Sequence, residues 1–295
     1  MMMKERSIEV GAPVPLAGIL TEPHAAAGAP TTAVVLLNAG VLHRVGANRL
    51  NFVLAQRMAA LGLLAVRFDA AGIGESSSRG PRASTLRPEI ADIIEVMDHI
   101  HRTRGIHRFV LAGLCSGAEQ SLDAAAADER VVGVIALEGY AYPTVQFWLR
   151  RYAPRLLVAS TWRRLLAGQN PMLRSMRQGS PTAEIDGPFS LRAALGGRRP
   201  TPKSEIEGIL KMLVARKVAM LAVYAGGSHH YYNYTGQLRD TFPTVRFGDL
   251  LDVVHEANAD HTFSGVRIRR RVVQRIEEWV STRGFGRATP AVSAD

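Results

Sequence analysis

The sequence predicts an α/β fold in which a mostly parallel sheet carries helices on both faces. Short, continuously apolar runs recur along the chain, and such runs are typical of strands that are buried on both sides. Segments with apolar residues at helical spacing alternate with these runs. Alternation of strands and helices is the pattern of parallel sheets. With 295 residues, the chain is long enough for one large domain or for a domain that carries an insertion.

The alternation is clearest in the first half of the chain. Two strands are expected first, an edge strand at 16–21 and a buried, β-rich strand at 32–37, which reads TAVVLL. Beyond them we expect strands at 63–68, 108–112 and 131–137, and helices at 47–61, 88–102 and 116–126.

The alternation then stops in an arginine-rich segment that reads as helices and loops. It contains a polar run rich in glycine and proline, 179–202, which is expected to be a loop. After it we expect a strand at 218–224, a helix at 234–241, a weak strand at 250–254 and a strong last helix at 264–282. The sequence therefore predicts a core of 1–139 and 217–285, a helical cap (140–216) inserted after the sixth core strand, and a flexible tail (286–295).

The composition restricts the class of protein. The net charge of +10 comes mainly from arginines, but these lack the interleaved aromatic residues or helix-turn-helix pattern of nucleic-acid binding, so no nucleic-acid partner is expected. One cysteine excludes an internal disulfide and a zinc site built on cysteines. No apolar run approaches the roughly 18 residues of a membrane span. We therefore expect a cytoplasmic protein without a membrane span.

The single cysteine lies in the pentapeptide G-L-C-S-G (113–117), between a predicted strand and a predicted helix. This is the position of a G-x-Nu-x-G nucleophile elbow, whose glycines let the neighbouring backbone approach without Cβ clashes. In this register Cys115 is the nucleophile and Ser116 supplies a backbone N–H to an oxyanion hole. A nucleophilic Ser116 would break the glycine spacing. The N-terminus of a helix also favours a thiolate. The alternative is that Cys115 is a small buried residue in an ordinary strand–helix turn.

Four motifs resemble, in the same order, those of the α/β-hydrolase superfamily. They are N-A-G-V-L-H-R-V-G-A-N-R-L at 38–50, F-D-A-A-G-I-G-E-S at 68–76, G-L-C-S-G-A at 113–118 and A-D-H-T-F at 259–263. In detail the chain looks like the bacterial serine-aminopeptidase-like hydrolases, near the exosortase-system-associated hydrolases. The resemblance covers nearly the whole chain and implies an α/β-hydrolase fold.

The resemblance also implies roles for individual residues. Cys115 corresponds to the nucleophile, and His261, in the loop before the last helix, to the general base. The turn at Gly40 and Val41 is expected to donate the second oxyanion N–H, beside that of Ser116.

The catalytic acid is the point at which this sequence departs from the superfamily. The superfamily usually places an aspartate after the seventh strand, where this chain has no carboxylate. Glu138, at the end of the sixth strand, is the first choice because the superfamily also uses that location. The alternatives are that Asp249 or Asp252 reaches back to the histidine, or that the Cys–His pair works without an acid. Asp260 adjoins the histidine but is expected to point elsewhere.

Three residues are candidates for substrate binding. Arg44 and Arg49 flank the oxyanion turn and can hold an anionic group, although ion pairs with loop carboxylates such as Glu75 explain them equally well. Tyr140 is expected where the core meets the cap. The function that follows is hydrolysis of a carboxylic ester or thioester of a small acyl substrate, with an anionic substrate as one option, through an acyl-cysteine and without a metal or organic cofactor. The alternatives are acyl transfer at the same site and a non-catalytic binding protein.

Overall fold

The computed structural model describes residues 3–23, 29–80, 86–156, 201–226 and 232–286. In this part of the chain, eight strands form one sheet in the order β1-β2-β4-β3-β5-β6-β7-β8. The strands are β1 (Lys4–Val10), β2 (Leu16–Glu22), β3 (Ala33–Leu36), β4 (Leu64–Phe68), β5 (Phe109–Leu114), β6 (Val131–Leu137), β7 (Ala219–Ala225) and β8 (Leu251–Glu256). Strand β2 is antiparallel to both β1 and β4, and the other pairs are parallel. The prediction of a mostly parallel sheet is confirmed.

The prediction of an edge strand at 16–21 is wrong, because β1 pairs along the outer side of β2. Strand β1 reads KERSIEV, and most of its residues are exposed. Charged residues are common on edge strands, where they discourage pairing with other chains. They also hide the apolar alternation by which a strand is recognised in a sequence.

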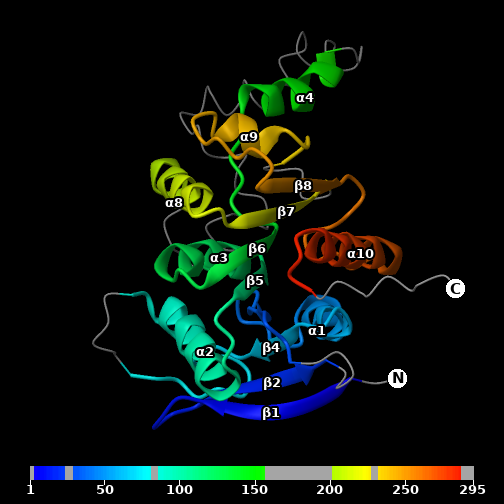
Figure 1. The fold of residues 1–295 in the computed structure, drawn as a ribbon. Coiled ribbons are helices and arrows are strands. Elements are labelled where there is room, and N and C mark those ends of the chain that lie inside the picture. The colour runs from blue at the N-terminus through cyan, green and yellow to red at the C-terminus, as the bar shows by residue number, and fades with distance from the viewer. Residues whose placement is uncertain (1–2, 24–28, 81–85, 157–200, 227–231, 287–295) are drawn as a thin grey trace, which may run out of the picture.

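Helices cover both faces of the sheet, as predicted (Figure 1). One face carries α1 (Leu50–Ala60) and α10 (Val266–Thr282), and the other carries α2 (Pro88–Arg104), α3 (Ser116–Ala127) and α8 (Lys203–Ala215). The short 3-10 helix η2 (Ala47–Arg49) precedes α1, and the short helix α9 (Gln237–Thr241) lies between β7 and β8.

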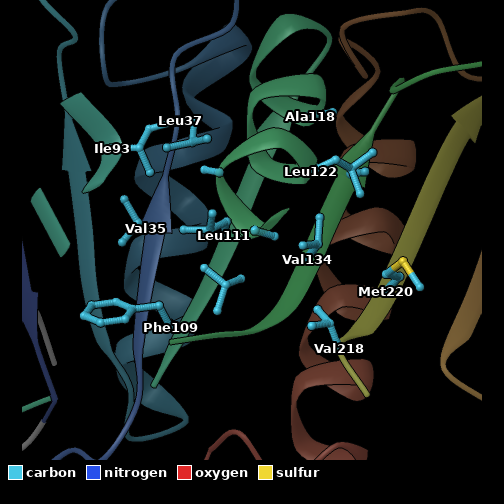
Figure 2. Packing of buried hydrophobic residues seen from close by; sticks show 14 of the residues in the cluster. Val35, Leu37, Ile93, Phe109, Leu111, Ala118, Leu122, Val134, Val218 and Met220 are labelled. Atoms are coloured by element: carbon cyan, nitrogen blue, oxygen red, sulfur yellow. The ribbon is translucent and has the colours of Figure 1, made fainter. Parts of the chain in front are cut away.

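Buried apolar side chains form one cluster on each face of the sheet. Along β5, Phe109 and Leu111 belong to the cluster beneath α2, α3 and α8 (Figure 2), whereas Val110 and Ala112 belong to the cluster beneath α1 and α10. Successive side chains of a strand point to opposite faces. A strand that is covered on both sides must therefore be apolar at every position, which is the pattern by which the sequence revealed it.

The segment between β6 and β7 contains the helices α4 (Val145–Leu156) and α8. The division into core and cap stays a prediction, because residues 157–200 lie outside the described part of the chain. Helix α8 buries Ile206, Leu210 and Leu213 in the core cluster that α3 shares. In α4, Phe147 is buried while Trp148 and Leu149 are exposed. The predicted tail also lies almost wholly outside the described residues, and no described helix is long and apolar enough to cross a membrane.

Candidate active site

The side chain of Cys115 is presented by a sharp turn between β5 and α3. Its backbone adopts φ 55° and ψ −118°, a conformation that costs a non-glycine residue free energy and that persists only where the surroundings enforce it. Its N–H donates to the carbonyl oxygen of Leu137 at 2.8 Å, which fixes the turn to the end of β6. The side chain is half-buried.

The two glycines of the pentapeptide are required by close backbone contacts. A Cβ on Gly113 would overlap the backbone of Gly117, and a Cβ on Gly117 would lie 2.5 Å from the backbone oxygen of Asn38. Because the glycines stand two residues before and two after Cys115, these contacts support the register in which Cys115 is the central residue of the elbow.

A carboxylate and an imidazole extend the site from Cys115. The Nδ1 of His261 lies 2.9 Å from Oε2 of Glu138, whose side chain is only 6% exposed. The other oxygen of Glu138 accepts the N–H of Ala225 at 2.5 Å. The Cys115 side chain also interacts with this imidazole and makes the largest contribution to its raised pKa. The His261 ring thus interacts with both the thiol and the carboxylate.

The electrostatics of this site favour a charged imidazole. The hydrogen bond with Cys115, followed by the one with Glu138, raises the pKa of His261 to about 10, against a smaller opposing effect of burial. A raised pKa means that the imidazolium is stabilised by partners that carry or share negative charge. The site therefore favours a protonated imidazole beside Cys115 and Glu138.

Two of the other carboxylates that were considered as the acid, Asp252 and Asp260, are engaged elsewhere. Asp252 accepts hydrogen bonds from Nε1 of Trp279, at 2.9 Å, and from Arg283. Asp260 accepts from the backbone N–H groups and hydroxyls of Thr262 and Ser264. These bonds lower the pKa of Asp260 to about 2 against the opposing effect of burial. The structure thus places Glu138 beside the histidine, and Asp260 points into its own loop.

The loop that carries His261 is held by residues that the sequence analysis did not single out. Nδ2 of Asn48 donates to the carbonyl oxygen of Thr262 at 3.1 Å, and Arg269 donates to that of Ser264 at 2.8 Å. The Asp260 bonds brace the same turn. The pattern D-x-T-x-S at 260–264 is a local signal for such a turn, because aspartate side chains readily accept backbone N–H groups a few residues on. The contact with Asn48 joins distant segments and has no such signal.

Two of the three residues predicted to form the oxyanion hole, Ser116 and Gly40, are in contact next to Cys115. Ser116 is the first residue of α3, and the first N–H groups of a helix have no partner within the helix. The N–H of Gly40 is already engaged, since it donates to Oγ of Ser116 at 2.7 Å. Val41, the other residue of the predicted oxyanion turn, is 87% exposed.

Arg44 takes part in a buried network below the oxyanion turn. Its guanidinium lies 2.5 Å from Asp69 and 2.5 Å from Glu75. The backbone N–H of Arg44 also donates to Asp69, at 2.6 Å. The Asp69 side chain is fully buried, and Asn38 also bonds to it. These are the ion pairs that the sequence left open as the alternative to substrate binding. They leave Arg44 as the residue that anchors the turn to the glycine loop.

The other two binding candidates lie apart from this network. Arg49 is exposed, and its guanidinium stacks 4.7 Å from the ring centre of Phe52. Tyr140 is half-buried; its hydroxyl lies 3.3 Å from that of Thr201, and its carbonyl oxygen accepts the hydroxyl of Tyr224. Tyr140 also lines a small apolar cavity between α3, α8 and the sheet.

Among the described residues, no group of three or more histidine, cysteine, aspartate or glutamate side chains is arranged to hold a metal ion. The arrangement that is present consists of a thiol, an imidazole, a buried carboxylate and a free backbone N–H at a helix N-terminus. Such a set can attack an electrophilic carbon, stabilise negative charge on the attached oxygen and move a proton to a leaving group.

No family model and no curated protein matches the chain. Several solved structures match it. An esterase of Pyrococcus furiosus matches with a TM-score of 0.60 and 13% identity, over 95% of this chain and 91% of that chain. A lidless α/β serine hydrolase of Xanthomonas campestris matches with a TM-score of 0.55 and 17% identity, over 97% of each chain. The mouse α/β hydrolase domain-containing protein 10 matches with a TM-score of 0.53 and 15% identity, over 95% of this chain and 99% of that chain. Together with the strand order and the elbow geometry, these similarities show that the chain has the α/β-hydrolase fold.

Proposed function

We propose that this protein hydrolyses a carboxylic ester or thioester with Cys115 as its nucleophile. The observation that carries the proposal is the position of His261 at the elbow of an α/β-hydrolase fold, 2.9 Å from Glu138 and interacting with Cys115. Each member has the chemistry that its position needs: a polarisable nucleophile, a proton carrier and a buried carboxylate that orients it.

In the first half of the reaction, the Cys115 thiolate attacks the acyl carbon and the carbonyl oxygen becomes an oxyanion. The backbone N–H of Ser116 stabilises this oxyanion. When the intermediate collapses, the bond to the leaving alcohol or thiol breaks. The His261 imidazolium gives its proton to that leaving group, and an acyl-cysteine remains.

In the second half, water cleaves the acyl-cysteine. The hydrogen bond with Cys115 makes the largest contribution to the raised pKa of His261, and acylation removes the negative charge of that partner. The neutral imidazole therefore becomes the favoured form at this stage, held in orientation by Glu138. It takes a proton from the attacking water, and collapse of the second intermediate releases the carboxylic acid and restores the thiolate–imidazolium pair.

The similar proteins support the reaction class. One of them is named an esterase and another a serine hydrolase, and hydrolysis is the reaction class that their names share. In this chain the central residue of the elbow is a cysteine, so the acyl-enzyme is a thioester. We further propose that the segment 140–216 forms a cap over the site, with α8 as its support on the core.

Turnover of p-nitrophenyl esters of increasing acyl-chain length tests the proposal. Wild-type protein should release p-nitrophenolate, and the Cys115→Ala variant should not. Mass spectrometry of acid-quenched protein should find the acyl group on the peptide that contains Cys115. The variant Asp252→Asn, which alters a carboxylate bonded to Trp279 and Arg283, is the matched control and should keep its activity.

Three results would point away from hydrolysis. Activity that survives in Cys115→Ala would contradict the proposed nucleophile. Faster acyl consumption with an added alcohol or amine, together with the corresponding transfer product, would indicate an acyltransferase. Absence of turnover and of acylation over the ester and thioester panel would favour a non-catalytic binding protein.

A further inference from the structure

The Ser116 hydroxyl occupies the position at which the N–H of Gly40 delivers its hydrogen bond. Oγ lies 2.7 Å from Gly40 N, and the two residues are 76 positions apart in the chain. In the expected arrangement this N–H would point to the substrate oxygen. We propose that the Ser116 hydroxyl is itself an oxyanion donor and therefore a catalytic residue. It accepts the hydrogen bond from the N–H of Gly40 and donates its own proton to the substrate oxygen. This inference rests on the proposed acyl chemistry of Cys115.

The hydroxyl has a proton to give. A serine hydroxyl donates one hydrogen bond and accepts up to two. Within the described part of the chain, Oγ of Ser116 accepts from Gly40, and the structure gives its proton no acceptor. A hydroxyl that accepts a hydrogen bond becomes a better donor, because successive hydrogen bonds polarise one another. The bond with Gly40 therefore prepares this hydroxyl to donate.

Its position suits the oxyanion. Ser116 directly follows Cys115, and it is half-buried. The oxyanion forms on the carbon that is bonded to the Cys115 sulfur, next to the first turn of α3. The backbone N–H and the hydroxyl of one serine are close enough to donate to the same oxygen. Ser116 then supplies both donors, and Gly40 holds the hydroxyl in place.

The bond is not an ordinary local use of a helix serine. Ser116 is the first residue of α3 and Cys115 holds the N-cap position, so the Ser116 hydroxyl does not cap the helix. Ser121, in the same helix, shows the usual local behaviour and donates to the carbonyl oxygen of Gly117 at 2.7 Å. Ser116 instead bonds to a different loop, which is the loop expected to complete the oxyanion hole.

Two reactions of the same thiol separate the oxyanion role from a structural one. Acylation by p-nitrophenyl acetate, followed as the first-turnover burst of p-nitrophenolate, passes through an oxyanion. Alkylation by iodoacetamide displaces iodide at a saturated carbon and forms none. In Ser116→Ala we expect acylation to slow by roughly tenfold to a hundredfold, and alkylation to stay within about twofold of wild type. Ser116→Thr, which keeps the hydroxyl, should acylate like wild type, as should the control Ser121→Ala.

The outcomes are distinguishable. Equal or faster acylation in Ser116→Ala would overturn the inference, because the hydroxyl would then be idle or would block the Gly40 donor. A parallel fall of acylation and alkylation would also overturn it, since that is the effect of a distorted elbow. Equal loss of acylation in the alanine and threonine variants would contradict a role for the hydroxyl. If wild-type protein is alkylated but never acylated, the proposed function fails, and this inference fails with it.

Discussion

The substitution Glu138→Gln removes the negative charge beside His261 and almost nothing else. Glutamine has the shape of glutamate, and its amide oxygen can still accept the N–H of Ala225, which Glu138 now binds at 2.5 Å. Its NH₂ group then faces Nδ1 of His261, where the carboxylate oxygen now lies at 2.9 Å. A protonated imidazole has only donors to offer, so the variant places a donor against a donor.

The size of the effect follows from the geometry. A hydrogen bond to a charged group contributes about 1.5–3 kcal/mol net, which corresponds to a pKa change of about one to two. The His261 side chain is 49% exposed, so solvent screens part of this interaction. The lower end of the range therefore applies, and Glu138→Gln should lower the pKa of His261 from about 10 in the wild type by about one.

The assay is an NMR titration of the histidine ring resonances of wild type and variant. Glu256→Gln is the matched control, because Glu256 stands at the end of β8, two strands away from β6 in the sheet, and pairs with Arg271 instead. A His261 midpoint that stays within a few tenths of wild type in Glu138→Gln would refute the reasoning. An equal fall in Glu256→Gln would refute it as well, since it would show a general effect of net charge.

Four further predictions concern stability, and unfolding by urea followed by circular dichroism checks each of them. Gly117→Ala should lower the free energy of unfolding by about 2–3 kcal/mol, because its Cβ would lie 2.5 Å from a neighbouring backbone oxygen. Gly208→Ala, in an exposed helix position with open space around it, should raise it by about 0.5–1 kcal/mol. Asp69→Asn should cost about 3 kcal/mol by leaving the buried Arg44 without its main counter-charge; an unchanged midpoint would show that this pair does not stabilise the fold. The pKa of His261 is raised to about 10 from an ordinary 6.5. The pairing of His261 therefore stabilises the fold fully below about pH 6.5, and this stabilisation is lost as the pH rises toward 10. The difference in the free energy of unfolding between wild type and His261→Gln should shrink over that range.

The elbow was predictable because its constraints leave a mark in one short stretch of sequence. The glycine spacing around Cys115 records two backbone contacts, and the flanking strand and helix patterns identify the turn that needs them. Glu138 was accessible for a related reason. In a parallel sheet the strands end at one edge, so a carboxylate at the end of β6 lies on the same side as the elbow at the end of β5.

The features that the sequence did not reveal depend on contacts between distant segments or on exposed residues. The hydrogen bond from Gly40 to Ser116 and the contact of Asn48 with Thr262 join loops that have no common periodicity. The strand β1 is exposed and charged, so burial leaves no apolar pattern in it. In each case the three-dimensional arrangement contains information that local patterns do not.

The central claim is that Cys115 carries a thiolate that His261 stabilises, and alkylation of native protein by iodoacetamide measures it most directly. The account predicts that wild-type Cys115 reacts almost as fast at about pH 6 as at about pH 9, because the pKa of His261 is raised to about 10 and the imidazolium persists over this range. His261→Ala should react slowly at about pH 6 and gain rate up to about pH 8.5, like an unassisted thiol, whereas the exposed control His107→Ala should match wild type. Parallel pH profiles for wild type and His261→Ala, or labelling only after unfolding, would contradict the account.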